Sequence, residues 1–208
     1  MKPLSRSLIA VAALSLAALY VVPIWRIDLS APQYPEGLGM KIWIDHLSGQ
    51  IDQINGLNHY IGMAVITEDQ FKEFLYMKYL VAVLIGLGLV AAAWNKRWLV
   101  LTWTTSIAAM GVLALYDMYQ WGYKYGHELD PTAAIKVEGM AYQPPLIGFK
   151  QLLNFGAWSL PDIGGILLWL ALLVGAGVCF YECYLRGRKQ RRSQTTQTTA
   201  TRATTLLA

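Results

Sequence analysis

The stretch LPDIGGILLWLALLVGAGVCFYECY, residues 160–184, is apolar over nearly its whole length. Asp162 and Glu182 are the only charged residues in it, and they lie close to its two ends. A helix needs about 20 such residues to cross the hydrocarbon core of a bilayer. Pro161 near the start and Asp162 in the first turn are typical of the opening of a helix. We therefore predict a membrane-spanning helix over this stretch.

Three further stretches of similar composition precede it, residues 7–25, 74–94 and 98–118. Tyrosine and tryptophan cluster at the ends of the stretches, where amphipathic rings sit at a membrane surface. The whole chain is 55% hydrophobic and 14% charged, whereas soluble domains are about 25% charged. The sequence predicts an all-α fold, an integral membrane four-helix bundle within residues 1–192, with two long structured extracytoplasmic loops, residues 26–73 and 119–159.

The distribution of charge indicates the orientation of the bundle. The N-terminus, the turn at residues 95–97 and the C-terminal region hold ten basic residues and one acidic residue, a net charge of +9. The loops and adjoining helix ends hold seven basic and twelve acidic residues, a net charge of −5. Because cytoplasmic segments carry the excess of Lys and Arg, we predict a multi-pass protein of the cytoplasmic (inner) membrane with both termini in the cytoplasm. The basic pI then results from the basic cytoplasmic segments, which face the anionic headgroups of the lipid bilayer. We therefore expect no nucleic-acid partner.

The two ends of the chain carry separate predictions. Lys2 and Arg6 precede the first apolar stretch, but that stretch is long and is closed by Arg26. We therefore expect an uncleaved anchor and not a signal peptide. The end of the chain, SQTTQTTATRATTLLA, has low complexity, and we expect residues 193–208 to form a disordered cytoplasmic tail.

Haem is not expected from this sequence. Cys179 and Cys183 lie four apart near the end of the last span, a spacing that favours apolar filler over a metal site. The motif Cys-x-x-Cys-His is absent from the sequence, so covalent c-type haem is not expected. His46, His59 and His127 all fall in the loops, so b-type haem held between spans is not expected either.

The first loop shows apolar residues at spacings of three and four, which predict helix. Gly49 and Gly56 are expected to break this helix into short amphipathic pieces that lie on the membrane surface. A lid packed on the bundle would explain the apolar side equally well. The residues of this stripe are Met40, Ile44, Leu47, Ile51, Ile54, Leu57 and Ile61.

The second loop begins with tyrosines that share one helical face, Tyr116, Tyr119 and Tyr123. They predict that the third span continues as a helix until Gly126 and Pro131 stop it. Further along, FKQLLNFGAW, residues 149–158, is predicted to be a short re-entrant or interfacial piece.

Histidine and methionine of the two loops form a candidate copper site. In GLNHYIGM, residues 56–63, His59 and Met63 share a face if the segment is helical. Imidazole and thioether are ligands that suit copper. The alternative is that the methionines fill a core and that His59 is a hydrogen-bonded structural residue. The candidate ligands are His59, Met63, His46, Met40, His127 and Met140.

A candidate quinol pocket is formed by Tyr116, Asp117, Tyr123 and His127, with Asp117 and His127 as proton acceptors. The alternative is that these aromatic residues belong to the interfacial belt of the bundle. Bound metal and bound quinone in the purified protein would distinguish the copper and quinol hypotheses.

Three segments carry a resemblance to a known family: LSAPQYPEGLGMKIWI (29–44), INGLNHYIGM (54–63) and YGHELDPTAAIKVEGMAYQPPLIGFKQLLNF (125–155). They resemble the NosB-like small polytopic membrane proteins of nitrous-oxide-reductase gene clusters, over both loops and their flanking spans. The resemblance implies a non-enzymatic accessory protein of denitrification that supports maturation of nitrous-oxide reductase, copper supply or electron delivery to it. The implied partners are the reductase or its accessory proteins. A quinol-interacting membrane anchor and a scaffold that docks partner subunits are the alternatives.

Overall fold

The computed structural model describes residues 1–94, 96–135, 141–152 and 154–185, the last three of these by their backbone alone. The predicted tail, residues 193–208, lies outside these ranges. The elements follow in the order α1 (Pro3–Ser15), η1 (Leu16–Tyr20), β1 (Trp25–Ala31), β2 (Tyr34–Ile42), β3 (Leu47–Gly49), α2 (Ile51–Ile61), η2 (Glu68–Gln70), η3 (Lys72–Leu75), α3 (Met77–Trp94), α4 (Arg97–His127), β4 (Gly148–Leu152), β5 (Phe155–Pro161), α5 (Ile163–Cys179) and η4 (Phe180–Leu185).

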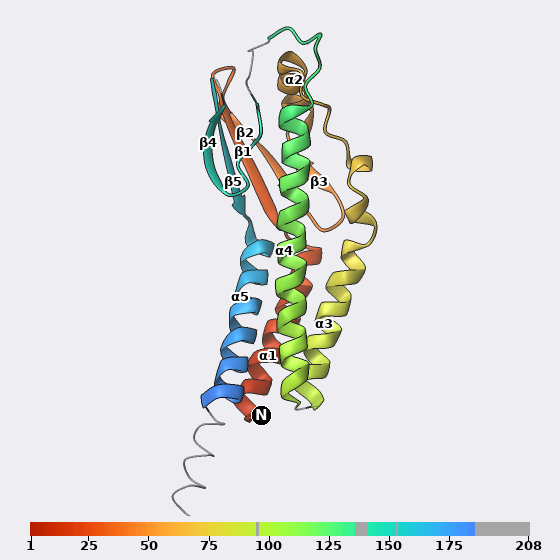
Figure 1. Cartoon of the computed structure of the whole chain (residues 1–208), viewed down its shortest axis with the longest axis vertical. Coiled ribbons are helices and arrows are strands. Elements are labelled where there is room, and N and C mark those ends of the chain that lie inside the picture. Colours follow the sequence, from red (N-terminus) through yellow and green to blue (C-terminus); the bar gives the residue numbers. More distant parts are fainter. Residues whose placement is uncertain (95, 136–140, 153, 186–208) are drawn as a thin grey trace, which may run out of the picture.

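The molecule has two parts, a helix bundle and a head (Figure 1). The bundle consists of α1 with η1, α3, α5 and the first two thirds of α4. The head consists of the five strands, α2, η2, η3 and the last third of α4. Four helical segments of the described chain are long and apolar enough to cross a membrane, Pro3–Tyr20, Met77–Trp94, Arg97–His127 and Ile163–Glu182. The prediction of four such helices is confirmed.

Small residues allow the helices of the bundle to approach closely, as in other membrane bundles. Trp103 on α4 is fully buried, and its indole N–H donates to the carbonyl of Leu84 on α3 at 3.0 Å. Gly88 on α3 faces both this indole and Ala13 of α1. A Cβ at Gly175 on α5 would lie 2.4 Å from the Thr104 hydroxyl. Bulkier residues at the two glycines would therefore separate the helices.

Charged side chains tie the helix ends together where the N-terminus lies. Glu182 is 1% exposed and accepts hydrogen bonds from the backbone N–H of Lys2 at 2.7 Å and from the Ser5 hydroxyl at 2.9 Å. A carboxylate at the start of α1 interacts favourably with the helix dipole. Arg6 donates from Nε to the carbonyl of Ala92, at the end of α3, at 2.8 Å. These contacts connect η4, which continues α5, to α1 and α3.

The prediction of a purely all-α fold is wrong, because the head contains a five-stranded antiparallel sheet in the order β3-β2-β1-β5-β4. The strand β1 follows the first helix of the bundle, and β5 leads directly into α5. These two strands pair in the centre of the sheet, with Ile27 opposite Ser159 and Leu29 opposite Ala157. The sheet therefore stands on two helices of the bundle (Figure 1).

The predicted helical stripe of the first loop is wrong before residue 51, since Met40 lies in β2 and Leu47 in β3. Along β2, Leu38 and Met40 are buried on one face while Lys41 is exposed on the other, which is the alternation of a strand. Gly49 does not break a helix. It has a φ of +108° and lies so close to β2 that a Cβ would be 2.1 Å from the Gly39 carbonyl.

Residues 51–61 do form the predicted amphipathic helix, and Gly56 lies inside it without breaking it. This helix α2 is not placed along the bundle, where a membrane surface would lie. It packs on the sheet at the far end of the head (Figure 1). The buried residues that hold sheet, α2 and α4 together are Ile27, Leu38, Met40, Leu47, Ile54, Ile66 and Tyr125.

The second loop is predicted correctly at its start and wrongly at its end. The third span continues to His127 as one helix, and Gly126 lies within its last turn. The segment FKQLLNFGAW is not an interfacial piece. It forms the hairpin of β4 and β5, with Phe149 opposite Trp158. At the start of α5, Asp162 is the N-cap, and its carboxylate accepts the N–H of Ile163 at 2.7 Å.

Candidate functional site

Helix α4 is longer than a membrane span requires. Its 31 residues extend about 46 Å at about 1.5 Å per residue, whereas the hydrocarbon core of a bilayer is about 30 Å thick. The last third of α4 therefore continues into the head, where it meets the chain segment of residues 64–73 that leads toward α3. The side chains of these two segments form a pocket at the junction of head and bundle.

This junction pocket has a volume of about 390 Å³. Its aromatic side is formed by Phe71, Trp121 and Tyr125, and its other side is polar. Ligand pockets of proteins are typically about 300–1,000 Å³ and combine apolar walls with a few polar groups. The full lining consists of Ala64, Gln70, Phe71, Glu73, Asp117, Gln120, Trp121, Lys124, Tyr125 and Glu128.

Specific contacts hold the two walls of the junction pocket in place. The Tyr125 hydroxyl lies within hydrogen-bonding distance of the Val65 carbonyl, at 3.0 Å, and of the Gln70 side-chain oxygen. The rings of Phe71 and Trp121 pack with centroids 5.1 Å apart. Asn55 on α2 bonds both backbone groups of Ile66, at 2.7 and 3.0 Å. The segment 64–73 is thereby fixed against α4 and α2.

The polar side of the junction pocket is acidic, since Glu73, Asp117 and Glu128 stand against the single ammonium of Lys124. Burial raises the pKa of the neighbouring Tyr76 hydroxyl, and the negative charges of Glu73 and Asp117 raise it further. Two carboxylates and a phenol thus lie together at the edge of the pocket nearest the bundle.

Trp121 supplies a donor on the aromatic side. Its indole N–H is buried and interacts with the neighbouring Tyr125 hydroxyl. The junction pocket can accordingly hold a flat ring against Phe71 and Trp121 and accept a hydrogen bond at Asp117 or Glu73.

The residues of the predicted quinol pocket are placed on two sides of α4. Asp117 lines the junction pocket, but Tyr116, Tyr123 and His127 do not. Tyr116 is 60% exposed and accepts a hydrogen bond from Gln120 at 2.9 Å. Tyr123 stacks on His127 with centroids 4.0 Å apart, and both are exposed. These three form a ladder along the neighbouring, open face of the helix.

The methionines of the predicted copper site are packed in the head. Met40 is 3% exposed and belongs to the buried cluster between sheet, α2 and α4. Met63 is half-buried against the same cluster. Gly62, with a φ of +78°, ends α2 before Met63, so Met63 does not continue the helical face of His59. Met140 lies outside the described residues.

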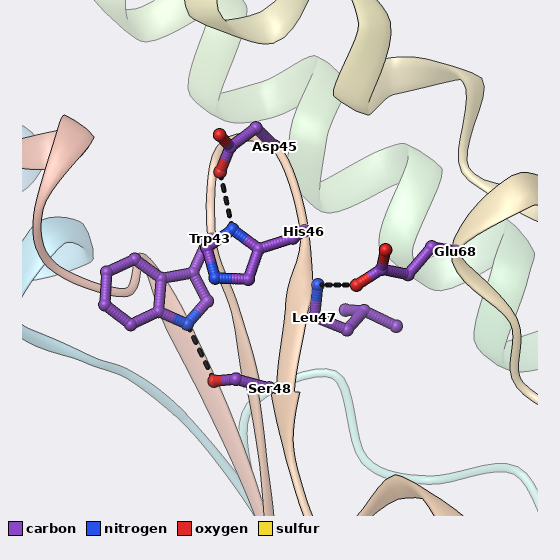
Figure 2. Close-up of polar contacts among 6 residues, drawn as sticks. All are labelled: Trp43, Asp45, His46, Leu47, Ser48 and Glu68. Atoms are coloured by element: carbon purple, nitrogen blue, oxygen red, sulfur yellow. Dashed lines mark hydrogen bonds and ion pairs between the residues drawn. The ribbon is translucent and has the colours of Figure 1, made fainter.

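The three histidines lie on different parts of the head. His46, in the turn between β2 and β3, stacks on Trp43 at 4.9 Å, and its Nδ1 lies 2.7 Å from Asp45 (Figure 2). His127 ends α4, and its Nδ1 is 2.9 Å from the Tyr123 carbonyl. His59 is exposed on α2 and meets Tyr60 edge-on at 6.2 Å. Within the described ranges, no three His, Cys, Asp or Glu residues are grouped as metal ligands. The copper site stays a prediction.

The sequence contained a signal for one wall of the junction pocket. Asp117, Trp121, Lys124 and Glu128 follow one another at spacings of four, three and four, a polar stripe on a predicted helix. The other wall, including Gln70 and Glu73, has no such pattern, because it is an irregular segment that only the fold brings to α4.

Comparison of the chain with protein-family models, with curated proteins and with solved structures finds no match. The family resemblance of the three sequence segments therefore stays an expectation.

Proposed function

We propose that this protein is a membrane accessory protein that binds a quinol-type molecule in the junction pocket and presents it to an extracytoplasmic reductase. The observation that carries the proposal is the pocket itself. It combines aromatic walls with paired carboxylates at the place where a long helix leaves the apolar layer. A quinol has matching chemistry, since it has a flat ring, two hydroxyl groups and an apolar tail.

The pocket residues would have separate roles. Phe71 and Trp121 would pack on the ring. Asp117 and Glu73 would accept hydrogen bonds from the hydroxyl group on the other side. The apolar tail would follow the lower part of α4 toward the bilayer. Asp117 and Glu73 lie at the end of the pocket nearest the bundle, so the tail would leave the site past these carboxylates.

Electron delivery by such a site has a simple balance. Each quinol that is oxidised releases two protons and two electrons. Asp117 and Glu73 would take up the protons and pass them to water at the head. The electrons would go to a metal centre of the partner reductase. This chain would hold and orient the quinol, which agrees with the accessory, non-enzymatic role that the family resemblance implies.

Copper supply and a purely structural scaffold are the other candidate functions. The burial of Met40 and Met63 and the separation of the histidines give copper less support than the junction pocket gives a quinol. For a scaffold, the exposed pair of Phe149 and Trp158 on the sheet offers a docking surface, with ring centroids 4.9 Å apart. Neither has an arrangement of side chains as specific as the junction pocket.

The proposed orientation places the head outside the cytoplasmic membrane. Lys2, Arg6 and Arg97 lie at the end of the bundle away from the head, which agrees with the excess of basic residues on the cytoplasmic side (Figure 1). We predict that alkaline phosphatase fused after Ile51 or after Gln143 is active, and that a fluorescent protein fused after Arg188 is fluorescent. A cytoplasmic signal from either loop fusion would contradict this orientation.

The quinol proposal predicts that purified protein in detergent binds a short-tailed ubiquinone or menaquinone analogue, and that Asp117→Asn weakens binding by at least about tenfold. The reason is the loss of a charged hydrogen-bond acceptor, which contributes roughly 1.5–3 kcal/mol. Ala64→Leu is expected to weaken binding as well, because its larger side chain fills the pocket. Binding is measured by isothermal titration and by the quinone content of protein purified from membranes.

Asp69→Asn is the matched control, since Asp69 is an exposed carboxylate on the same segment and does not line the pocket. It should leave the affinity unchanged. If Tyr123→Phe lost as much quinone affinity as Asp117→Asn, the binding site would lie on the open face of α4 and not in the junction pocket. The proposal would be refuted if the protein bound no quinone. Bound copper that is lost in His59→Ala would then favour the metal-handling alternative.

A further inference from the structure

One rung of the sheet brings two cations side by side. Arg26 on β1 lies directly opposite Lys41 on β2. The same rung continues to Leu160 on β5 and to Ser48 on β3. Residues directly opposite each other in antiparallel strands point to the same face, with Cβ atoms about 4.5–5.5 Å apart. Like charges in this position destabilise a sheet unless an anion lies between them.

This basic rung is on the open face of the sheet. The neighbouring residues Ile27 and Met40 point to the buried cluster, so Arg26 and Lys41 point the other way, and both are exposed. Asp28 gives partial compensation, with an oxygen 3.6 Å from Arg26 Nε. Both side chains are nearly half exposed, so this pair is weak. Lys41 has no ion pair within the described part of the chain.

The rung also lies at the level where lipid headgroups are expected. The next rung toward the bundle is Trp25 with Pro161. Below it, the carbonyls of Pro23 and Ile24 accept hydrogen bonds from the first turn of α5, at 2.8–3.1 Å. A rung advances about 3.3 Å along a strand, whereas the headgroup layer adds about 5–7 Å to each side of the hydrocarbon core. If the hydrocarbon core ends at the start of α5, Arg26 and Lys41 stand within the headgroup layer.

A hydroxyl and an interfacial tryptophan complete the surroundings of the rung. The indole of Trp43 donates to the Ser48 oxygen at 2.8 Å (Figure 2). The hydroxyl hydrogen of Ser48 has no acceptor that the described residues provide, so it is available beside Lys41. The head side has a net charge of −5 over the sequence. Two cations on adjacent strands are therefore a local exception and not part of a generally basic surface.

We propose that Arg26, Lys41 and Ser48 bind the phosphate of an anionic phospholipid, such as phosphatidylglycerol, in the leaflet on the head side. The guanidinium and ammonium groups neutralise the phosphate, and the Ser48 hydroxyl donates to it. Bound lipid removes the repulsion within the rung and fixes the sheet relative to the bilayer. The inference depends on the proposed membrane placement and is independent of the junction pocket.

Phosphatidylglycerol, phosphatidylcholine and inorganic phosphate are added separately to the full-length protein in detergent. Native mass spectrometry counts the retained lipids, and hydrogen exchange of peptides covering residues 24–48 locates them. We expect phosphatidylglycerol alone to slow exchange in these peptides. In Arg26→Gln with Lys41→Gln, we expect one fewer retained phosphatidylglycerol and at least a tenfold loss of its local effect. The basic cytoplasmic residues are the same in both proteins and do not contribute to this difference.

Controls separate charge from folding. The exchanged pair Arg26→Lys with Lys41→Arg should keep the effect, and so should Lys150→Gln elsewhere in the head. If the double variant is unstable, Lys41→Gln alone is tested in its place. It leaves the Arg26–Asp28 pair intact and should still weaken the effect of phosphatidylglycerol. An unchanged response in the glutamine variants, an equal response to phosphatidylcholine, or full protection by inorganic phosphate would overturn the proposal. Loss of quinone binding would leave it intact.

Discussion

Replacement of Gly88 by leucine is expected to prevent close packing of the bundle and to lower the free energy of unfolding by about 3 kcal/mol. A Cβ at Gly88 would lie 2.6 Å from the Cβ of Ala13 and 2.7 Å from Nε1 of Trp103. Both neighbours are fully buried, and the Trp103 indole is held by the Leu84 carbonyl. Neither can move without separating α1 or α4 from α3. Thermal unfolding of the purified protein in detergent measures the effect.

Gly86, two residues before Gly88 on the same helix, provides the matched control. No atom lies within 4 Å of a Cβ placed there. Gly86→Leu adds the same side chain to α3, and we expect the free energy of unfolding to change by less than about 0.5 kcal/mol. If both variants lost stability equally, the cause would lie in α3 alone and not in its contacts with α1 and α4.

The helices of the bundle could be predicted from the sequence because an apolar stretch of membrane length is a local property. The sheet could not be predicted in this way. Its central pair joins Ile27 to Ser159, which are far apart in the sequence. In the first loop, the apolar residues of β2, β3 and α2 happen to follow one another at spacings of three and four. Only pairing with β1 shows that Met40 alternates with Lys41 across a strand.

The candidate site was predictable in part for a related reason. The sequence alone shows that Asp117 is an acidic residue at the end of an apolar stretch, residues 98–118. Grouping it with Tyr116, Tyr123 and His127 combined two faces of one helix, since neighbouring positions differ by about 100° around the axis. The partner of Asp117 in the junction pocket is Glu73, which belongs to an irregular segment. Its position depends on the contacts of Tyr125 and Asn55, and no sequence period indicates these.

The second large effect is expected for Gly126→Ala in the last turn of α4. A Cβ at this position would lie 2.3 Å from the backbone nitrogen of Gln143 and 2.4 Å from its Cα. The Gly126 carbonyl also accepts the N–H of Tyr142 at 3.0 Å, and Tyr142 is 1% exposed. The methyl group must therefore push this backbone away from α4. We expect a loss of about 2 kcal/mol and faster hydrogen exchange in residues 141–152.

Gly122 lies one turn earlier on α4 and faces the same segment, so it tests whether the effect depends on distance. A Cβ at Gly122 would be 3.7 Å from Pro144 Cγ, which is an ordinary van der Waals contact. Gly122→Ala should keep the exchange rates and the unfolding temperature of the unaltered protein. Normal exchange in Gly126→Ala would mean that residues 141–146 are not held against α4. Because β4 begins at Gly148, release of this segment should also loosen the hairpin of β4 and β5 while the bundle stays folded.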